Sequence, residues 1–271
     1  MIEDRLTIAI DLARQAGMLL REGYGRVTEV KYKGEIDLIT EFDLRSEQLL
    51  VEGIQQAYPN DAILAEENGL MGEGEYRWLI DPLDGTTNFA HSIPIFVISL
   101  AFAQGSQPQL GVIYDPMRDE LFHATVDDGA WLNGRRLHVS ASPTLNQSLL
   151  VTGFPYDMRT NPDNNLDHFA NLALCSRGVR RLGSAALDLA YIAAGRFDGY
   201  WEMRLWPWDW GAGMLMVKEA GGRVTRIDGG VEVFAEPTSI LATNGHIHDE
   251  MLDVLNLITT HPPADLDVVL T

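Results

Sequence analysis

The feature that most constrains this chain is an apolar strand pattern that ends in two closely spaced carboxylates. It is the segment Trp78-Leu79-Ile80-Asp81-Pro82-Leu83-Asp84-Gly85-Thr86-Thr87-Asn88-Phe89. Pro82 fixes its own φ and pushes Asp81 toward extended geometry, so we expect the strand to end at Asp81 and the chain to turn there. Two acids at a strand end can share hard cations, and the following Gly-Thr-Thr offers backbone N–H groups and hydroxyls to a phosphate. This corner predicts phosphoryl chemistry.

Three further segments place acidic side chains where they could join the same site. In chain order, their acids are Asp37, Glu41, Asp43, Glu66, Glu67 and Asp209. Each segment alone is most simply a turn or a solvated surface, because Asp-Pro and Asp-Gly are common turn formers and most acids are exposed. Four such segments in one chain favour a shared site over four separate turns.

Together the segments resemble the inositol monophosphatase family, in the family's order and near its spacing, over nearly the whole chain. The matching residues are Lys33-Gly34, Asp37–Asp43, Glu66-Glu67, Asp81–Phe89, Gly183-Ser184-Ala185 and Trp208–Gly222. The segments Asp81–Phe89 and Trp208–Gly222 are highly specific as a pair. The chain departs from the family at Ala65, Leu83 and Gly211, where Gly, Ile and Ala are usual, and none of these departures removes a carboxylate.

The apolar periodicity predicts a mixed α+β and α/β fold in two halves. Residues 1–143 predict two helices on a mostly antiparallel sheet, with one helix at 4–22 and another opened by the Thr40-x-x-Asp43 capping-box pattern. Strands are expected near 62–66, 77–81, 95–104, 109–115 and 120–125. Residues 144–271 alternate strands with helices, as an α/β layer does. The resemblance implies a layered α-β-α-β-α sandwich of the sugar phosphatase type, one phosphatase domain with its site between the halves.

Within residues 144–271 the helices are expected at 165–174, 185–194 and 209–220, and the strands at 149–152, 178–181, 199–202, 223–225 and 240–242. The tail 259–271 is weakly patterned, which is typical of a mobile chain end.

The acidic composition and the cysteine content restrict the partners. A net charge of −19 argues against a general attraction to nucleic acid, which carries the same sign. Cys175 is the only cysteine, so no intrachain disulfide can form, and a reducing, cytoplasmic location is predicted. We expect Cys175 to fill a helix face rather than to act as a nucleophile. No window approaches the roughly 18 uninterrupted apolar residues of a membrane span.

The resemblance implies a magnesium site with oxygen ligands only. Glu66, Asp81 and the backbone carbonyl of Leu83 would hold one Mg²⁺, and Asp81, Asp84 and Asp209 a second, with two or three ions in all and Mn²⁺ able to substitute. Two ions roughly 3.5–4 Å apart need a bridging carboxylate, for which Asp81 is the best candidate. Such ions would also reverse the unfavourable potential of an acidic protein toward an anionic substrate. The resemblance further implies sensitivity to Li⁺ and a homodimer.

Catalytic roles fall on a threonine and two acids. Thr86 and Asp43 are candidates to orient and deprotonate the attacking water, next to Glu66, although Thr86 could instead cap the helix that begins there. The expected substrate-binding residues are Gly85, Thr86, Thr87, Gly183, Ser184, Ala185, Glu202 and Asp209. Lys33 is either a site residue or a solvated loop lysine.

Substrate specificity depends on Glu202, which stands seven residues before Asp209. The resemblance gives a Glu at this place the role of accepting hydrogen bonds from inositol hydroxyls, as a carboxylate can. A carboxylate would equally suit the ammonium of histidinol phosphate. Arg181 and Arg204 are either phosphate ligands of a bisphosphate enzyme or surface residues.

The sequence therefore predicts Mg²⁺-dependent hydrolysis of a phosphate monoester, foremost myo-inositol 1-phosphate, by metal-activated water. The alternatives are phosphatases of histidinol phosphate, fructose 1,6-bisphosphate, NADP or 3′-phosphoadenosine 5′-phosphate, because the metal site is shared and the leaving-group pocket is built from loops. An alternative of another class is a regulatory or binding protein on a phosphatase scaffold. The intact set of carboxylates argues against lost catalysis, though not against a second role.

Overall fold

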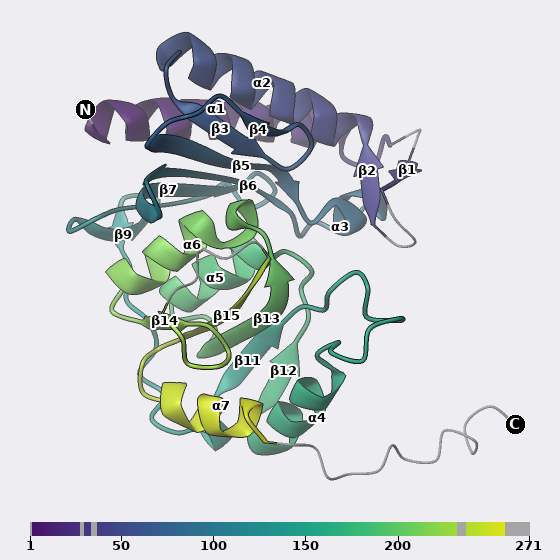
Figure 1. Cartoon of the computed structure of the whole chain (residues 1–271), viewed down its shortest axis with the longest axis vertical. Coiled ribbons are helices and arrows are strands. Elements are labelled where there is room, and N and C mark those ends of the chain that lie inside the picture. The colour runs from purple at the N-terminus through teal and green to yellow at the C-terminus, as the bar shows by residue number, and fades with distance from the viewer. Residues whose placement is uncertain (1, 28–29, 34–36, 232–236, 258–271) are drawn as a thin grey trace, which may run out of the picture.

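The computed structural model describes residues 2–27, 30–33, 37–231 and 237–257, and their elements form five layers (Figure 1). Two helices cover the outer face of an eight-stranded sheet, two lie between this sheet and a five-stranded one, and two cover the far face. The outer pair is α1 (Ile2–Gly23) with α2 (Glu41–Ala57), and the middle pair is α5 (Ala185–Ala193) with α6 (Pro207–Glu219). The pair on the far face is α4 (Leu166–Cys175) with α7 (His248–Leu255). The predicted α-β-α-β-α sandwich is confirmed.

The eight-stranded sheet comes entirely from the first half of the chain, in the order β10-β9-β8-β7-β6-β5-β3-β4. Its neighbours are antiparallel except β3 and β5, which run parallel, so the mostly antiparallel sheet is confirmed. The strand bounds are β3 Ala62–Ala65, β4 Gly69–Met71, β5 Tyr76–Asp84, β6 Val97–Gln104, β7 Gln107–Asp115, β8 Glu120–Thr125, β9 Gly129–Leu132 and β10 Arg135–Arg136. A separate hairpin joins β1 (Val30–Tyr32) to β2 (Leu38–Thr40).

The five-stranded sheet comes from the second half, in the order β12-β11-β13-β15-β14. The strands β12, β11 and β13 are parallel and joined through helices, whereas β15 is antiparallel to both its neighbours. The strand bounds are β11 Leu149–Thr152, β12 Gly178–Arg180, β13 Gly199–Leu205, β14 Arg223–Thr225 and β15 Thr238–Thr243. The expected α/β layer is present, while the division into domains at residue 143 stays a prediction.

The first turn of α2 confirms the capping box predicted from the sequence. The Thr40 hydroxyl accepts from the backbone N–H of Phe42, and the Asp43 carboxylate accepts from the backbone N–H of Thr40 at 2.8 Å. This exchange satisfies donors that a helix start leaves unpaired. It also points Asp43 away from solvent toward the end of β5.

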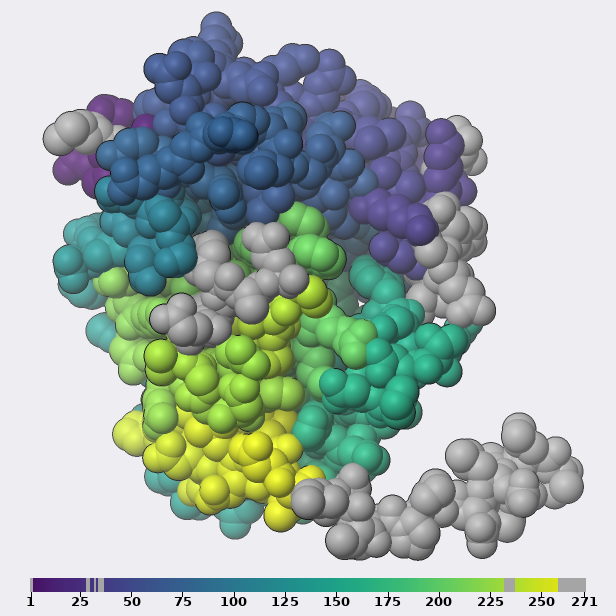
Figure 2. All heavy atoms as spheres, viewed as in Figure 1, coloured from purple at the N-terminus to yellow at the C-terminus, as the bar shows by residue number. Residues whose placement is uncertain are grey.

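The middle helix α6 lies very close to the eight-stranded sheet. A Cβ on Gly211 would lie 2.7 Å from Leu79 Cδ1, and one on Gly111 would lie 2.7 Å from the Ala212 Cα. Only glycine permits these approaches. One cluster of buried apolar side chains runs from Leu79 in the first sheet to Leu189 in α5, so the two halves share a core. The halves also meet closely in the space-filling view (Figure 2).

The end of β5 differs from the expectation. The strand does not stop at Asp81 but continues through Pro82 to Asp84. Asp81 pairs with Ser99 and Asp84 with Val97, so β5 carries one residue more than β6 between these pairs. Such a bulge accommodates a proline that cannot donate to the ladder, and it bends the strand. The turn expected at Asp81 therefore comes at Gly85.

Other expectations also need correction. The strand β4 and the helix α7 had no predicted counterpart. Cys175 ends α4 with an exposed side chain, so the expectation that it fills a helix face is wrong. The tail 259–271 and Gly34 lie outside the described residues. Among the described helices, none is both long and apolar enough to cross a membrane.

Candidate active site between the two sheets

The structure brings four of the predicted acids from both halves of the chain to one place. Glu66 follows β3 and Asp81 lies on the parallel strand β5, with the Glu66 N–H donating to the Ile80 carbonyl at 3.1 Å. Asp84 ends β5, and Asp209 lies in the first turn of α6, where its carboxylate accepts from the Trp206 N–H at 2.7 Å. The bulge and the parallel pairing thus position three acids, and a helix start supplies the fourth.

These acids strongly affect one another. Burial raises the pKa of Asp81 well above its usual range, and the negative charges of Glu66, Asp84 and Asp209 raise it further. Burial also raises the pKa of Glu66 to about 7 and that of Asp209 well above its usual range. Burial and like charge both disfavour the ionised form. A site of this kind therefore favours any cation that can be coordinated by oxygen.

Asp84 connects the end of β5 to the N-terminus of α5. Its carboxylate accepts from the Ser184 hydroxyl at 2.7 Å, from the Ala185 N–H at 3.2 Å and from the Ala186 N–H at 2.7 Å. Burial raises the pKa of Asp84 to about 6, although these hydrogen bonds lower it. Ser184 and Ala185, predicted to bind substrate, are therefore beside the acids and donate to one of them.

Thr86 and Asp43 form the hydrogen-bonded pair that a water-activating role requires. The Thr86 hydroxyl lies 2.8 Å from Asp43 Oδ1 and 3.0 Å from the carbonyl of Leu83. Burial raises the pKa of Asp43, while its hydrogen bonds to Thr40 and Thr86 lower it. The short helix α3 (Thr86–Ala90) is preceded by Gly85 and has no side-chain cap, so Thr86 does not serve as that helix's cap.

The turn at Gly85 requires glycine. Its φ is +102°, and a Cβ there would lie 2.9 Å from the carbonyl oxygen of Ile95. Thr87 follows with an exposed side chain. The sequence assigned no role to Asn88. Its Nδ2 donates to the carbonyls of Ile95 and Leu182, both at 2.8 Å. Asn88 thereby connects this turn to the segment that leads into Gly183.

Lys33 is not the solvated loop lysine that the sequence left open. Its ammonium lies 2.9 Å from Glu66 Oε1 and 2.5 Å from Glu67 Oε1, and its side chain is 26% exposed. Burial alone would lower the pKa of Lys33, yet the two glutamates raise it above its usual value. The buried Glu47 accepts from the N–H groups of Glu67 and Asn68 at 2.8 and 2.9 Å. Nothing in the sequence pattern distinguishes Glu47 as the residue that fixes this turn.

Glu202 lies on β13, on the side of the second sheet that faces α5. The Tyr200 hydroxyl donates to Glu202 Oε2 at 2.7 Å. Burial raises the pKa of Glu202 to about 7, with Tyr200 and Arg181 lowering it and Asp84 raising it. A Cβ on Gly153 would lie 2.1 Å from Glu202 Oε1, so glycine leaves room for this carboxylate. Sequence reasoning found Glu202 but missed Tyr200 and Gly153.

The oxygen atoms of the site suit a hard divalent ion, although the acidic side chains do not converge on one point. Among the described residues, no three His, Cys, Asp or Glu side chains surround a common point as metal ligands do. Glu66 is directed to Lys33, and Asp84 to the start of α5. Carboxylate and carbonyl oxygens are nevertheless the ligands that Mg²⁺ and Mn²⁺ prefer. Mutual repulsion of the acids is the property that such an ion would relieve.

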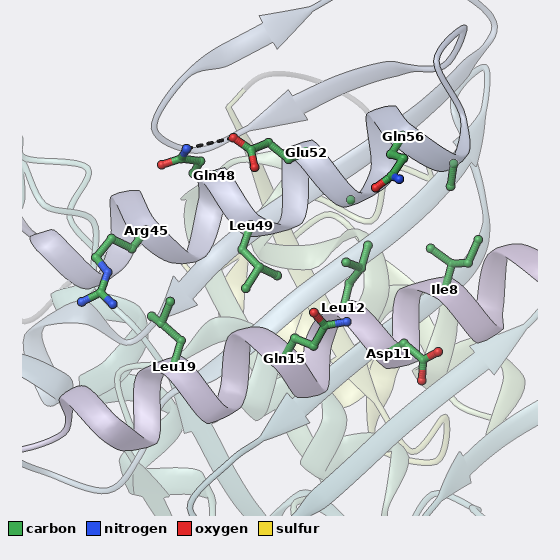
Figure 3. A pocket seen from close by; sticks show the side chains of 12 residues that line it. Ile8, Asp11, Leu12, Gln15, Leu19, Arg45, Gln48, Leu49, Glu52 and Gln56 are labelled. Carbon is green, nitrogen blue, oxygen red and sulfur yellow. Dashed lines mark hydrogen bonds between the residues drawn. The ribbon is translucent and has the colours of Figure 1, made fainter.

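A groove elsewhere on the molecule contains none of the predicted site residues. It is a groove of about 670 Å³ between α1 and α2, with Leu12, Leu19 and Leu49 along its floor and Arg45 and Glu52 at its edge (Figure 3). Its lining is the partly apolar seam of two packed helices, without a cluster of acids. The candidate active site is therefore identified by its acids and not by this groove.

Comparison with known proteins agrees with this geometry. The model of the inositol monophosphatase family matches residues 1–259. An inositol-1-monophosphatase of Synechocystis is 45% identical over 253 residues, 92% of this chain and 88% of that protein. The Nus factor SuhB of Pseudomonas aeruginosa is 43% identical over 273 residues, 98% of this chain and 99% of that protein.

A solved structure of an inositol monophosphatase from Anabaena is also similar, with a TM-score of 0.86 at 46% identity, covering 94% of this chain and 96% of that one. Fold, sequence and acid arrangement agree along almost the entire length of the chain. The chain therefore belongs to the inositol monophosphatase family and is a phosphatase, a phosphoric monoester hydrolase.

Proposed function

We propose that this phosphatase hydrolyses a polyol monophosphate, foremost myo-inositol 1-phosphate, and that it needs Mg²⁺. The observation that carries the proposal is the set of four mutually repelling acids beside the Thr86–Asp43 pair. Repelling acids in a partly buried site disfavour binding of an anionic phosphate unless a cation joins them. Mg²⁺ at this place would supply that charge and would generate hydroxide from water near neutral pH.

The residues of the chain then have distinct tasks. Glu66, Asp81, the Leu83 carbonyl, Asp84 and Asp209 would hold the ions, with Asp81 shared between two of them. Their positions at the ends of β3 and β5 and the start of α6 fix which oxygens can converge. Holding most of these ligands on β5 and at the start of α6, rather than on long loops, limits how far each can move.

Thr86 and Asp43 are proposed to orient the attacking water. Asp43 can accept the hydroxyl proton of Thr86 across their 2.8 Å hydrogen bond, which leaves the Thr86 oxygen free to accept from a water. Asp43 is itself fixed by the Thr40 N–H, so the pair is held before substrate arrives. The N–H groups of Gly85, Thr86 and Thr87 would bind the phosphate oxygens.

Substrate choice is proposed to depend on Glu202, whose carboxylate would accept from hydroxyls of the leaving alcohol. Gly183, Ser184 and Ala185 would form the opposite wall, next to Asp84. The name of the Synechocystis relative supports an inositol phosphate as substrate. Phosphatases of histidinol phosphate, fructose 1,6-bisphosphate, NADP and 3′-phosphoadenosine 5′-phosphate are the alternatives that the experiment must separate.

The experiment is phosphate release from a panel of these compounds, with Mg²⁺, with Mn²⁺ and with EDTA. We expect turnover only with the divalent ions and the highest kcat/KM for myo-inositol 1-phosphate. Asp81→Asn should abolish nearly all turnover while the protein stays folded, because the shared ligand loses its charge. Asp253→Asn, at an exposed position on α7, is the matched control and should leave turnover unchanged. Near-native turnover in EDTA would refute the metal requirement.

A second candidate is a regulatory or binding role on the same scaffold. It is favoured by the printed name of the P. aeruginosa relative, a Nus factor, at 43% identity over 98% of this chain. A strain that carries Asp81→Asn in place of the native residue separates the two functions. If only turnover matters, this strain will behave like a deletion strain; a milder phenotype would show a role independent of turnover.

The homodimer and the cytoplasmic location are retained as parts of the proposal. The homodimer rests on family membership, and the location rests on the single cysteine, Cys175. Light scattering of the purified protein tests the dimer directly, since a monomeric mass would exclude it.

A further inference from the structure

Arg204 has a backbone conformation that is unfavourable for an arginine. It lies near the end of β13, two residues after Glu202, with a φ of +60°. Between the pairs Glu202–Ile240 and Leu205–Thr238, β13 carries one residue more than β15. Glycine is the usual residue where such a bulge adopts a left-handed φ, because a side chain there crowds its own backbone. A strained residue of this kind persists where its surroundings fix it, and such residues gather at functional sites.

The side chain of Arg204 forms an ion pair with Asp157. Oδ2 of Asp157, which faces Arg204, also accepts from Asn161 Nδ2 at 3.0 Å. The Asp157 carbonyl accepts from the N–H groups of Thr160 and Asn161, both at 3.0 Å. Asp157 therefore fixes a turn of its own segment and joins that turn to β13 through Arg204.

The turn belongs to a loop, residues 153–165, whose two ends are held together. Figure 1 shows this loop in teal between β11 and α4. The buried Asn165 donates from Nδ2 to the Gly153 carbonyl at 2.6 Å, and its Oδ1 accepts from Trp201 Nε1, also at 2.6 Å. Loops with joined ends are compact and frequently functional. Beyond the joined ends, the ion pair connects the outer part of the loop to β13.

The 153–165 loop borders the candidate active site. At its start, Gly153 lies directly against the carboxylate of Glu202, since a Cβ there would be 2.1 Å from Glu202 Oε1. Tyr156 is next to Asp157 in the loop and exposes much of its ring. Its hydroxyl is nevertheless withdrawn from bulk water, which raises its pKa, and the negative charges of the site acids raise that pKa further. The loop therefore contributes a wall beside the acids.

We propose that Arg204 is a positioning residue that holds the 153–165 loop beside the site through Asp157. With the ion pair intact, the loop is in place before substrate arrives, so substrate binding does not have to order it. Breaking the pair should therefore weaken substrate binding and leave the chemical step nearly unchanged. The inference rests on the proposed function for its substrate, while the hold on the loop can be measured without turnover. It gives Arg204 a task other than binding a phosphate of a bisphosphate substrate.

The first test measures kinetics of the Mg²⁺-loaded full-length enzyme on myo-inositol 1-phosphate. Arg204→Gly removes the side chain and suits the left-handed backbone, so its melting temperature should not fall. Asp157→Asn removes the other charge of the pair. Each variant should raise KM about two- to fivefold, the range for loss of an exposed ion pair, and change kcat by less than about twofold. The double variant should raise KM no further than either single one, and Arg204→Lys, which keeps the cation, should stay near the wild-type KM.

A second test follows the loop itself without turnover. The loop contains the exposed Arg159, and trypsin cleaves after arginine in chain that has left its fixed conformation. Arg204→Gly and Asp157→Asn should be cut after Arg159 about two- to fivefold faster than the wild type, because cleavage follows the population of the open loop. Arg223→Ala is the matched control, since Arg223 forms an exposed ion pair with Asp249 on α7 and its loss removes the same charge. It should change neither KM nor the cleavage rate.

A raised KM in Arg204→Gly without one in Asp157→Asn would mean that Arg204 contacts the substrate itself, and it would overturn the inference. An unchanged cleavage rate in both variants would overturn it as well, because the pair would then not hold the loop. Faster cleavage with a wild-type KM would show that the held loop does not serve the site, which is a third contrary result. If the wild type releases no phosphate from any compound of the panel, the proposed function fails, and the trypsin measurement still decides whether the pair fixes the loop.

Discussion

The raised pKa of Glu202 predicts how Glu202→Gln changes stability with pH. In the folded, metal-free protein the pKa of Glu202 is about 7, against a usual value of 4.5. Folding therefore favours the protonated acid. The resulting stability is fully present below pH 4.5 and is lost as the pH rises to about 7, because the unfolded chain ionises first. Glutamine has a similar shape, stays neutral and can still accept from Tyr200, so the variant does not lose this stability.

The magnitude follows from the difference between the two pKa values. A difference of this size corresponds to roughly 3 kcal/mol, taken as an upper limit because Glu202 is only partly buried. At pH 5, which is half a unit above the usual value, the variant should be the more stable of the two by a little under about 1 kcal/mol. At pH 8 the variant should be the more stable of the two by up to about 3 kcal/mol. A substitution in the pocket thus stabilises the metal-free protein.

Urea denaturation in EDTA at pH 5, 6, 7 and 8 measures this difference, since the free energy of unfolding is obtained by linear extrapolation. Glu22→Gln, at an exposed position of α1, is the control for the general effect of removing one negative charge from an acidic protein. Parallel pH curves for the wild type and Glu202→Gln would refute the reasoning, because they would mean that Glu202 titrates alike in both states.

The remaining predictions concern turnover. Thr86→Ala should lower kcat by about 10²–10⁴-fold, as loss of a general-base partner does, and should change the Mg²⁺ concentration for half activity much less. Li⁺ should inhibit at millimolar rather than molar concentrations, because a small hard ion can enter an oxygen-lined site without supplying a second charge; complete insensitivity would count against the roles of Asp84 and Asp209. Glu202→Gln should reduce kcat/KM for myo-inositol 1-phosphate by about one to two powers of ten relative to 4-nitrophenyl phosphate, the cost of about 1.5–3 kcal/mol for a charged hydrogen bond. Equal losses on both substrates would mean that Glu202 supports the site without contacting the alcohol.

The sequence predicted the acids well because each stands next to a strong local signal. Apolar runs ended at Glu66 and Asp81, and a Thr-x-x-Asp pattern marked Asp43 as the start of a helix. Local signals of this kind require no knowledge of distant residues. The hydrogen bond between Thr86 and Asp43 joins residues 43 positions apart, and the sequence predicted only that both serve the attacking water.

Residues that support the site from another element were not predictable in this way. Glu47 lies on α2 among other polar residues, and its contact with the Glu67 N–H arises only when α2 packs beside β5. The strand end expected at Asp81 was mispredicted because a bulge depends on the register of β6, not on the proline alone.

The placing of three acids at the edge of the first sheet and of the fourth at the start of α6 explains how the fold tolerates them. Three of the four acids are fixed by a hydrogen bond to an element of regular structure: Asp209 to the start of α6, Asp84 to the start of α5, and Asp81 to the Leu83 N–H at 3.0 Å. The apolar core that joins Leu79 to α5 and α6 offsets the repulsion among the acids. Neither sheet could form this core alone. A cation that reduces this repulsion would therefore stabilise the contact between the two halves as well as activate water, so metal binding and the closeness of the halves are expected to be thermodynamically linked.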